Sequence, residues 1–368
     1  MRIVGVDVHR CHLPLVRPFR TSFGSEYVKD VLLIEVRTAD GFVGWGECVA
    51  SPQPDYSYEF NDAAVLVLRE HLVPRVMGID LRPEDVAQRL APVRGHPMAR
   101  GALELAILDA YLRSTGESLA SYLGSVRSEV DCGVSVGIPD DDSLDTLMAE
   151  VAVYVDEGYR RIKLKIQPGW DVAPVRAVRE QWPDMPLQVD ANQAYDRHHL
   201  EHLAKLDDFG LLLIEQPFAE DDLFGHRLIA ERMATPVCLD ESVLSAANVE
   251  ALIDYGACDI VNIKAGRVGG YLEAKAIHDL CLGLGVPVWC GGMLETGVGR
   301  AANIALASLA GFTLPGDTSA SSRFFARDVT EPFVLHDGRI TVPTGPGIGV
   351  TPIPQMLAEL TVARTHLA

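Results

Sequence analysis

A repeat of about 25 residues constrains the fold more than any other feature of the sequence. Five short apolar runs rich in Val, Ile and Leu each end in a charged residue, and a helix-like segment follows each run. This alternation is typical of successive βα units around a parallel sheet. The strand-end residues are Lys165, Asp190, Glu215, Asp240 and Lys264, spaced by 25, 25, 25 and 24 residues. The spacing predicts a (β/α) barrel, which carries its chemistry at the carboxyl ends of its strands.

The same patterning divides the chain into three parts. Residues 1–128 begin with β-like alternation and continue with helical periodicity, which predicts a separate α+β domain. Residues 129–317 hold the βα repeats, and residues 318–368 become β-like again, so we expect this tail to fold back onto the first domain. Within the first domain, 18–24 and 51–57 are predicted loops. The predicted barrel strands are 131–136, 160–166, 186–191, 210–216, 236–240, 258–264 and 286–291, with 312–317 as an eighth strand or its remnant.

Charge and cysteine usage exclude several classes of protein. A net charge of −19 argues against nucleic acid or an anionic membrane as a partner. No apolar run reaches the ~18 residues of a membrane span, and we expect no signal peptide. The seven cysteines are odd in number and include no C-x-x-C, which favours reduced thiols and a cytoplasmic location.

The charged strand ends are expected to meet inside the barrel. Period-2 alternation places Lys163 and Lys165 on one face of their strand, and the apolar face must contact the helices. Asp190, Glu215 and Asp240 come from three adjacent strands. Three oxygen ligands without His or Cys suit a hard divalent cation such as Mg²⁺, or Mn²⁺ in its place. The alternative is that each acid caps a helix N-terminus, but three acids one strand apart beside lysines favour the metal site.

A cation between two lysines predicts a reaction at the α-carbon of a carboxylate. The metal would bind the substrate carboxylate, one neutral lysine would remove the α-proton, and the other lysine would help to stabilise the enediolate. Because a neighbouring cation lowers the pKa of a lysine, we expect Lys163 and the metal to favour a neutral Lys165. A site with excess positive charge inside an acidic protein also predicts a small anionic carboxylate as substrate.

At these residues the chain resembles the enolase superfamily, in its muconate-lactonizing subgroup. The resemblance is carried by K-x-K, D-x-N, E-Q-P and D-E-S at 163–165, 190–192, 215–217 and 240–242, and by Lys264. It is closest to o-succinylbenzoate synthases that also act as N-acylamino acid (N-succinylamino acid) racemases. Further segments that match are P-F-R-T-S-F-G, G-W-G-E-C, W-C-G-G-M-L-E-T-G and F-T-L-P-G-D-T-S-A-S, so the resemblance covers essentially the whole chain.

The resemblance implies a modified TIM barrel, (β/α)₇β, under an α+β capping domain whose loops near 18–24 and 51–57 close the site. It makes the three carboxylates the Mg²⁺ ligands, Lys165 and Lys264 the acid/base pair, and Lys163 the residue that holds the substrate carboxylate. Further substrate contacts that it implies are Ser135, Asn192, Gly292 and Met293.

The resemblance also implies the reaction. Lys165 would dehydrate 2-succinyl-6-hydroxy-2,4-cyclohexadiene-1-carboxylate by syn elimination, a step of menaquinone biosynthesis, and the two lysines together would racemise N-acylamino acids. A homo-oligomer is expected on the same ground.

Other functions stay open at this point. A dedicated N-succinylamino acid racemase or another enzyme of the subgroup would use the same residues. A Schiff-base aldolase would use one barrel lysine without metal, and a binding protein without catalysis would leave the buried charges unexplained. Dipeptide epimerases of the subgroup carry D-x-D near the eighth strand, where Asp317 is followed by Thr and Ser319. Mandelate-racemase-like members use a His base where this chain has Lys264.

Overall fold

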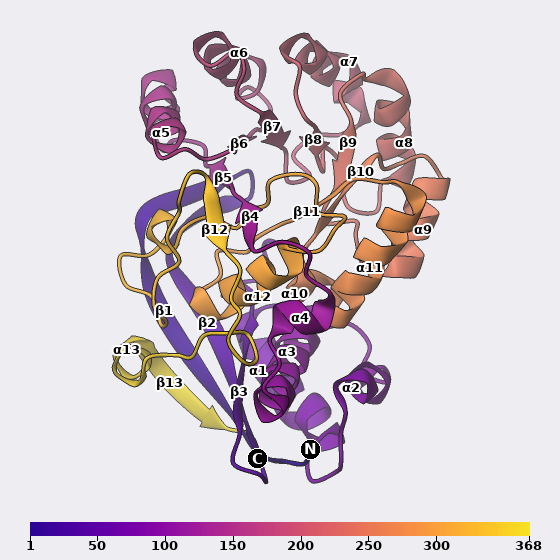
Figure 1. Cartoon of the computed structure of the whole chain (residues 1–368). Helices are drawn as coiled ribbons and strands as arrows, with labels where there is room; N and C mark the ends of the chain where they lie inside the picture. The colour runs from indigo at the N-terminus through magenta and orange to yellow at the C-terminus, as the bar shows by residue number, and fades with distance from the viewer.

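The repeat in the sequence forms a curved parallel sheet of seven strands in the computed structural model, which describes residues 1–368 (Figure 1). The strands lie side by side in chain order, from β5 at one edge to β11 at the other. Each ends close to where its apolar run ends. The strands are β5 Gly133–Val136, β6 Arg161–Lys165, β7 Leu187–Asp190, β8 Ile214–Glu215, β9 Val237–Leu239, β10 Ile260–Ile263 and β11 Val288–Cys290.

The segment 312–317 joins the two edges of this sheet. Phe312 forms a single parallel bridge with Val288, the first residue of β11. Gly316 forms one with Cys132, which directly precedes β5. The amide of Asp317 also donates to the carbonyl of Cys290, at 2.8 Å. Pro315 has no N–H to contribute, so the segment makes isolated bridges instead of a ladder. The predicted eighth strand is therefore a short remnant that nevertheless connects both edges.

Helices cover the outer face of the sheet (Figure 1), and buried apolar side chains of the strands and helices pack together there. Ile162 and Leu164 of β6 belong to the core shared with the helices, while Lys163 and Lys165 point the other way. Leu213, Cys238, Ile260 and Trp289 form a separate buried cluster, on the strand face that carries the charged ends. The helices are α5 Leu144–Asp156, α6 Val172–Gln181, α7 Leu200–Leu203, α8 Leu223–Arg232, α9 Ala246–Asp254, α10 Ala265–Val268, α11 Tyr271–Leu284 and α12 Gly297–Ala307.

The first part of the chain forms an antiparallel sheet packed on a long helix. The strand order is β13-β1-β2-β3, with β1 at Ile3–Thr21, β2 at Gly24–Thr38, β3 at Val43–Cys48 and β13 at Thr361–His366. A Cβ at Gly44 or Gly46 would lie only 2.1 or 2.0 Å from a carbonyl oxygen of α3, Pro97–Thr115. Glycine at these positions therefore lets β3 lie directly on α3. Shorter helices complete the layer: α1 Asn61–Val67, a π turn at Leu68–Leu72, a 3-10 turn at Val73–Arg75, α2 Pro83–Leu90 and α4 Leu119–Leu123.

The loop predicted at 18–24 is in fact the tip of a β-hairpin. β1 and β2 stay paired to the end, with Thr21 opposite Gly24, so only the two residues between them turn. The sequence pattern obscures the strand because the pairing is irregular between Pro14 and Phe19. The prediction of a loop at 51–57 is confirmed, since these residues form no helix or strand beyond an isolated bridge at Ser51.

The end of the chain returns to the first sheet. β13 pairs with β1, and the two termini lie next to each other (Figure 1). Before it come β12 Arg339–Thr341, which pairs with β4 Glu129–Asp131, and α13 Pro354–Leu360. The boundaries at 128 and 317 stay predictions. None of the helices combines the length and the apolar character that a membrane crossing requires.

Candidate active site

The predicted strand-end residues meet at the mouth of the barrel, and all are buried. The ammonium of Lys165 donates to Asp190 Oδ2 and to Asn192 Oδ1, each at 2.6 Å. The ammonium of Lys264 donates to Asp240 Oδ2 at 2.7 Å. Because β7, β8 and β9 lie between β6 and β10, the two amines contact the two outer carboxylates of the row.

Lys163 lies between the carboxylates instead of at an end of the row. Its ammonium is 2.8 Å from Asp317, 3.1 Å from Glu215 and 3.3 Å from Asp190. It also lies over the Trp289 ring, 4.7 Å from the centroid. Lys163 is thus fully engaged with protein groups in this structure, and a role toward a substrate carboxylate stays a prediction.

The three predicted metal ligands present the right donors for a hard cation. Asp190, Glu215 and Asp240 supply oxygen only, and Asp240 Oδ1 is buried without a hydrogen-bond partner. No three acidic, histidine or cysteine side chains converge closely enough to hold an ion, because each carboxylate of the trio is drawn to a lysine. Asp240 Oδ1, which is buried and accepts no hydrogen bond, is available to a divalent ion. Such an ion would compete with the lysine ammonium groups for the three carboxylates.

The carboxylates set the charge state of the lysines. Burial opposes the charged form of Lys163, but Asp317, Glu215 and Asp190 outweigh burial and raise its pKa. The pKa of Lys264 is likewise well above its ordinary value, because Asp240 and other acidic neighbours outweigh burial. Negative groups surround each of these two amines more closely than positive ones. The expectation of a neutral Lys165 next to Lys163 and a metal ion stays a prediction.

The carboxylates respond in opposite directions to the same surroundings. Burial and the neighbouring Asp190 raise the pKa of Glu215 well above its ordinary value. For Asp190, burial acts in the same direction, but Lys165 and Lys163 outweigh it and lower the pKa. Asp190 is therefore ionised more readily than an ordinary carboxyl group, and Glu215 less readily. Added positive charge near Glu215 would stabilise its ionised form.

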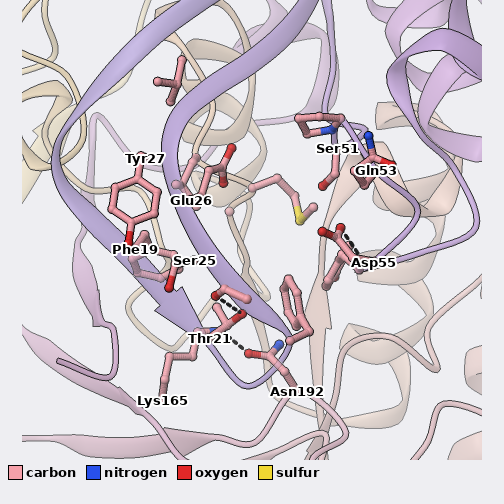
Figure 2. A pocket seen from close by; sticks show the side chains of 18 of the residues that line it. Phe19, Thr21, Ser25, Glu26, Tyr27, Ser51, Gln53, Asp55, Lys165 and Asn192 are labelled. Atoms are coloured by element: carbon pink, nitrogen blue, oxygen red, sulfur yellow. Dashed lines mark hydrogen bonds between the residues drawn. The ribbon is translucent and has the colours of Figure 1, made fainter. Parts of the chain in front are cut away.

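A cavity of about 260 Å³ opens onto the two lysines, and Figure 2 shows the part of it that Lys165 lines. Lys165 and Asn192 lie at one end of it, beneath the tip of the β1–β2 hairpin. Lys264 lines the same cavity. The hairpin and the loop at 51–57 form its walls, with aromatic rings and a few acidic side chains. The wall residues include Phe19, Phe23, Glu26, Tyr27, Ser51, Gln53, Asp55 and Tyr56.

The remaining predicted substrate contacts also line this region. Asn192, Gly292 and Met293 line the main cavity, and Ser135 lines a smaller adjoining one. Ser135 Oγ is buried without a partner, so it has hydrogen-bonding capacity to offer a ligand. The structure thus brings all ten predicted residues to one place, while their roles stay predictions.

Two residues that the sequence analysis did not select complete the site. Tyr56 of the 51–57 loop accepts a hydrogen bond from Lys264, at 3.2 Å. Asp317 binds both Lys163 and Arg161, at 2.8 and 2.9 Å. Nothing in the local pattern distinguishes Tyr56 from other loop tyrosines. Asp317 could have been found from its place at the end of the predicted eighth strand.

Comparison with known families agrees with this arrangement. Residues 4–124 match the N-terminal domain of the mandelate racemase / muconate lactonizing enzymes, and residues 146–356 match the family described as enolase C-terminal domain-like. The chain belongs to the enolase superfamily. Members of the superfamily typically use a divalent metal ion, and the oxygen donors at the barrel mouth suit one.

Enolase-superfamily relatives resemble the chain along its full length. An N-succinylamino acid racemase from an Amycolatopsis species is 57% identical, over 100% of both chains. An o-succinylbenzoate synthase from Geobacillus kaustophilus is 48% identical, over 95% of this chain and 93% of the relative. A solved enolase-superfamily structure from Listeria innocua superimposes with a TM-score of 0.95 at 40% identity, over 100% of both chains. The capping sheet and curved barrel described above are thus the superfamily's own architecture.

Proposed function

We propose that this chain is a metal-dependent o-succinylbenzoate synthase that also racemises N-acylamino and N-succinylamino acids. The observation that carries the proposal is the placement of Lys165 and Lys264, which line one cavity and contact the two outer carboxylates of the row. Such a pair can exchange protons with one α-carbon from two sides. The two kinds of relative described above support the two activities.

The metal would be held by Asp190, Glu215 and Asp240. Mg²⁺ is the proposed ion, with Mn²⁺ able to take its place, because the donors are all oxygen. When bound, the ion offsets the negative charge that develops on the substrate carboxylate during proton removal. The proposed substrates are therefore small anionic carboxylates.

In the dehydration, one lysine handles both proton transfers. Lys165 removes the α-proton of 2-succinyl-6-hydroxy-2,4-cyclohexadiene-1-carboxylate and gives a proton to the hydroxyl as it leaves as water. Because both transfers take place on the face of Lys165, the elimination is syn. Lys264 stays protonated on the other side and stabilises the enediolate, which suits the raised pKa that its acidic neighbours give it.

In the racemisation, the two lysines act in turn. One lysine removes the α-proton of the N-acylamino acid, and the other delivers a proton to the opposite face. The protonation states of the two amines are then exchanged, so the enzyme is ready for the reverse direction without another proton donor. Asn192 contacts Lys165 at 2.6 Å and can hold that amine in place for both reactions.

The proposal is tested by assaying purified protein on both substrate classes before and after chelation. We expect turnover of both with Mg²⁺ and none with excess chelator. Lys165→Ala should lose both activities by at least about 10²–10⁴-fold, the usual contribution of a general acid or base. Lys205→Ala removes an exposed lysine and is the matched control. Turnover that survives chelation but is trapped by borohydride would instead establish a Schiff-base enzyme.

A dedicated N-succinylamino acid racemase is the second candidate, since a relative of that name matches the whole chain. The ratio of kcat/KM for the two substrates decides between them, and synthase turnover below 1% of racemisation, taken as roughly a 3 kcal/mol preference, would favour the dedicated racemase. Neighbouring menaquinone genes would favour the synthase. A cytoplasmic location and a homo-oligomeric state stay predictions.

A further inference from the structure

Gln216 occupies a buried position between two of the proposed metal ligands. It directly follows Glu215 at the end of β8, is 0% exposed, and has a positive φ of 37°. Its amide donates to the carbonyl of Cys238 on one side, at 2.9 Å, and its carbonyl accepts from Gln193 on the other side, at 2.8 Å. A non-glycine residue in this region of φ is held there by its surroundings.

The side chain of Gln216 fixes the turn that begins with Asp240. Its Oε1 accepts hydrogen bonds from the amides of Asp240 and Ser242, at 3.0 and 3.2 Å. Its Nε2 donates to Ser242 Oγ at 2.8 Å and to the carbonyl of Phe218 at 3.2 Å. The side-chain amide of Gln216 therefore hydrogen-bonds backbone groups that follow both β8 and β9, namely the carbonyl of Phe218 and the amides of Asp240 and Ser242. The regular pairing of the two strands has ended there.

His226 on α8 lies next to that amide. Its Nδ1 lies 2.8 Å from the carbonyl of Asp222, which fixes Nδ1 as the donor and leaves Nε2 as an acceptor. Nε2 is 3.4 Å from the amide of Phe218 and 3.4 Å from Gln216 Nε2. Burial lowers the pKa of His226 to about 4, so the ring is neutral near pH 7. The acceptor at Nε2 favours the NH₂ end of Gln216 on that side and the carbonyl end toward Asp240.

We infer that Gln216 is a positioning residue for Asp240, and that His226 supports it by accepting from the amide of Phe218, whose carbonyl accepts from Gln216 Nε2. This inference rests on the proposed function, in which Asp240 is a metal ligand and the partner of Lys264. Of the Asp240 carboxylate, Oδ2 contacts Lys264, and Oδ1 accepts no hydrogen bond but lies 3.8 Å from Arg267 Nε. No protein hydrogen bond therefore fixes Oδ1, and the backbone that Gln216 anchors determines where it points.

The test is the affinity for Mn²⁺, measured on the purified protein by electron paramagnetic resonance, alongside kinetics. Gln216→Ala should weaken Mn²⁺ binding about 10–100-fold, the usual effect of losing a group that orients a ligand. Gln216→Glu keeps the acceptor for Asp240 but loses the donor, and His226→Phe removes the ring acceptor. Both should weaken binding by smaller factors, about 3–10-fold. If Gln216→Ala does not fold, these two variants carry the test.

Gln193→Ala is the control, because its side chain accepts only from the amide of Glu220, at 2.8 Å. Its Mn²⁺ affinity should equal that of the wild type. Wild-type affinity in all three test variants would overturn the inference while leaving the proposed function intact. Failure of the wild-type protein to bind Mn²⁺ would instead overturn the proposed function, so the two failures are distinguishable.

Discussion

The carboxylate of Glu47, in the capping sheet, accepts hydrogen bonds from both the amide and the hydroxyl of Thr296 in the barrel, at 2.9 and 2.6 Å. It also accepts from the amide of Gly299, at 2.8 Å, and so caps the N-terminus of α12. Glu47 lies on β3, which leads into the loop at 51–57, and Thr296 ends the segment that carries Gly292 and Met293. One buried carboxylate thus connects two walls of the cavity.

Replacing Glu47 should therefore affect both stability and substrate binding. Glu47→Ala leaves two amides and a hydroxyl without a partner, and we expect a loss of about 2–4 kcal/mol in the free energy of unfolding. The two cavity walls that Glu47 connects should become less ordered, which should raise KM about 5–20-fold with a smaller change in kcat. The reason is that substrate binding is weakened while the groups that transfer protons are unchanged. Urea denaturation and steady-state kinetics with Mg²⁺ measure the two effects.

Asp207→Ala is the matched control for Glu47. The Asp207 carboxylate accepts from the amides of Ala234 and Thr235, at 3.0 and 2.8 Å. These residues precede β9, so they lie at the end of the barrel away from the site. The control should lose stability without a change in KM. An unchanged KM in Glu47→Ala as well would show that the contact is only structural.

A second interdomain carboxylate makes stability depend on pH. Glu104 on α3 accepts from the amide of Leu272 at the start of α11, at 3.1 Å. Burial raises the pKa of Glu104 from 4.5 to about 7, despite the opposing effect of the helix amides. The folded protein therefore binds a proton more tightly than the unfolded chain, and the free energy of unfolding falls as pH rises from about 4.5 to 7. The full shift corresponds to about 3 kcal/mol for this group.

Glu104→Gln should remove that part of the pH dependence. The variant keeps an oxygen for Leu272 but cannot ionise. Its free energy of unfolding should therefore fall less than that of the wild type between pH 5 and pH 8. Urea denaturation at pH 5, 6, 7 and 8 gives the comparison. Burial also raises the pKa of Glu47 and of Glu59 from 4.5 to about 7, so a residual slope is expected. Identical slopes in both proteins would contradict the prediction.

The sequence was sufficient to predict the barrel and its strand-end residues, for a physical reason. In a parallel barrel the repeat length fixes where each strand ends, and alternation fixes which face a side chain takes. Lys165, Asp190, Glu215, Asp240 and Lys264 therefore followed from spacing alone. Their convergence needed no knowledge of loop geometry, because the strands are neighbours in chain order.

What the sequence could not provide depends on contacts between distant segments. Tyr56 meets Lys264 across 208 positions of the chain, and no local pattern encodes that meeting. The charge state of Lys163 depends on Asp317 as well as on Glu215 and Asp190, and the contact with Asp317 spans 154 positions of the chain, so no local pattern encodes it. The hairpin at 19–26 was mistaken for a loop because its pairing is interrupted before it resumes.

Tyr56 should matter more for one of the two reactions than for the other. Tyr56→Phe keeps the ring near Lys264, at 5.2 Å, but removes the hydroxyl that accepts from the ammonium. A loss of about 1–2 kcal/mol is expected in steps where Lys264 transfers a proton, which slows racemisation about 5–30-fold. Dehydration uses Lys264 only as a cation and should change less than about 3-fold. Equal losses in both assays would contradict separate roles for the two lysines.

The two lysines are separated most directly by isotope exchange in D₂O. If each amine faces one side of the α-carbon, Lys165→Ala should retain α-proton exchange with one enantiomer of an N-succinylamino acid, and Lys264→Ala with the other. Racemisation should fall in both by about 10²–10⁴-fold. Each substitution also removes the ammonium nearest to a buried carboxylate, Asp190 or Asp240, so Mn²⁺ binding is measured on the same samples to show that the site is intact. Exchange of both enantiomers by either variant would mean that one amine reaches both faces, and the two-lysine mechanism would be wrong.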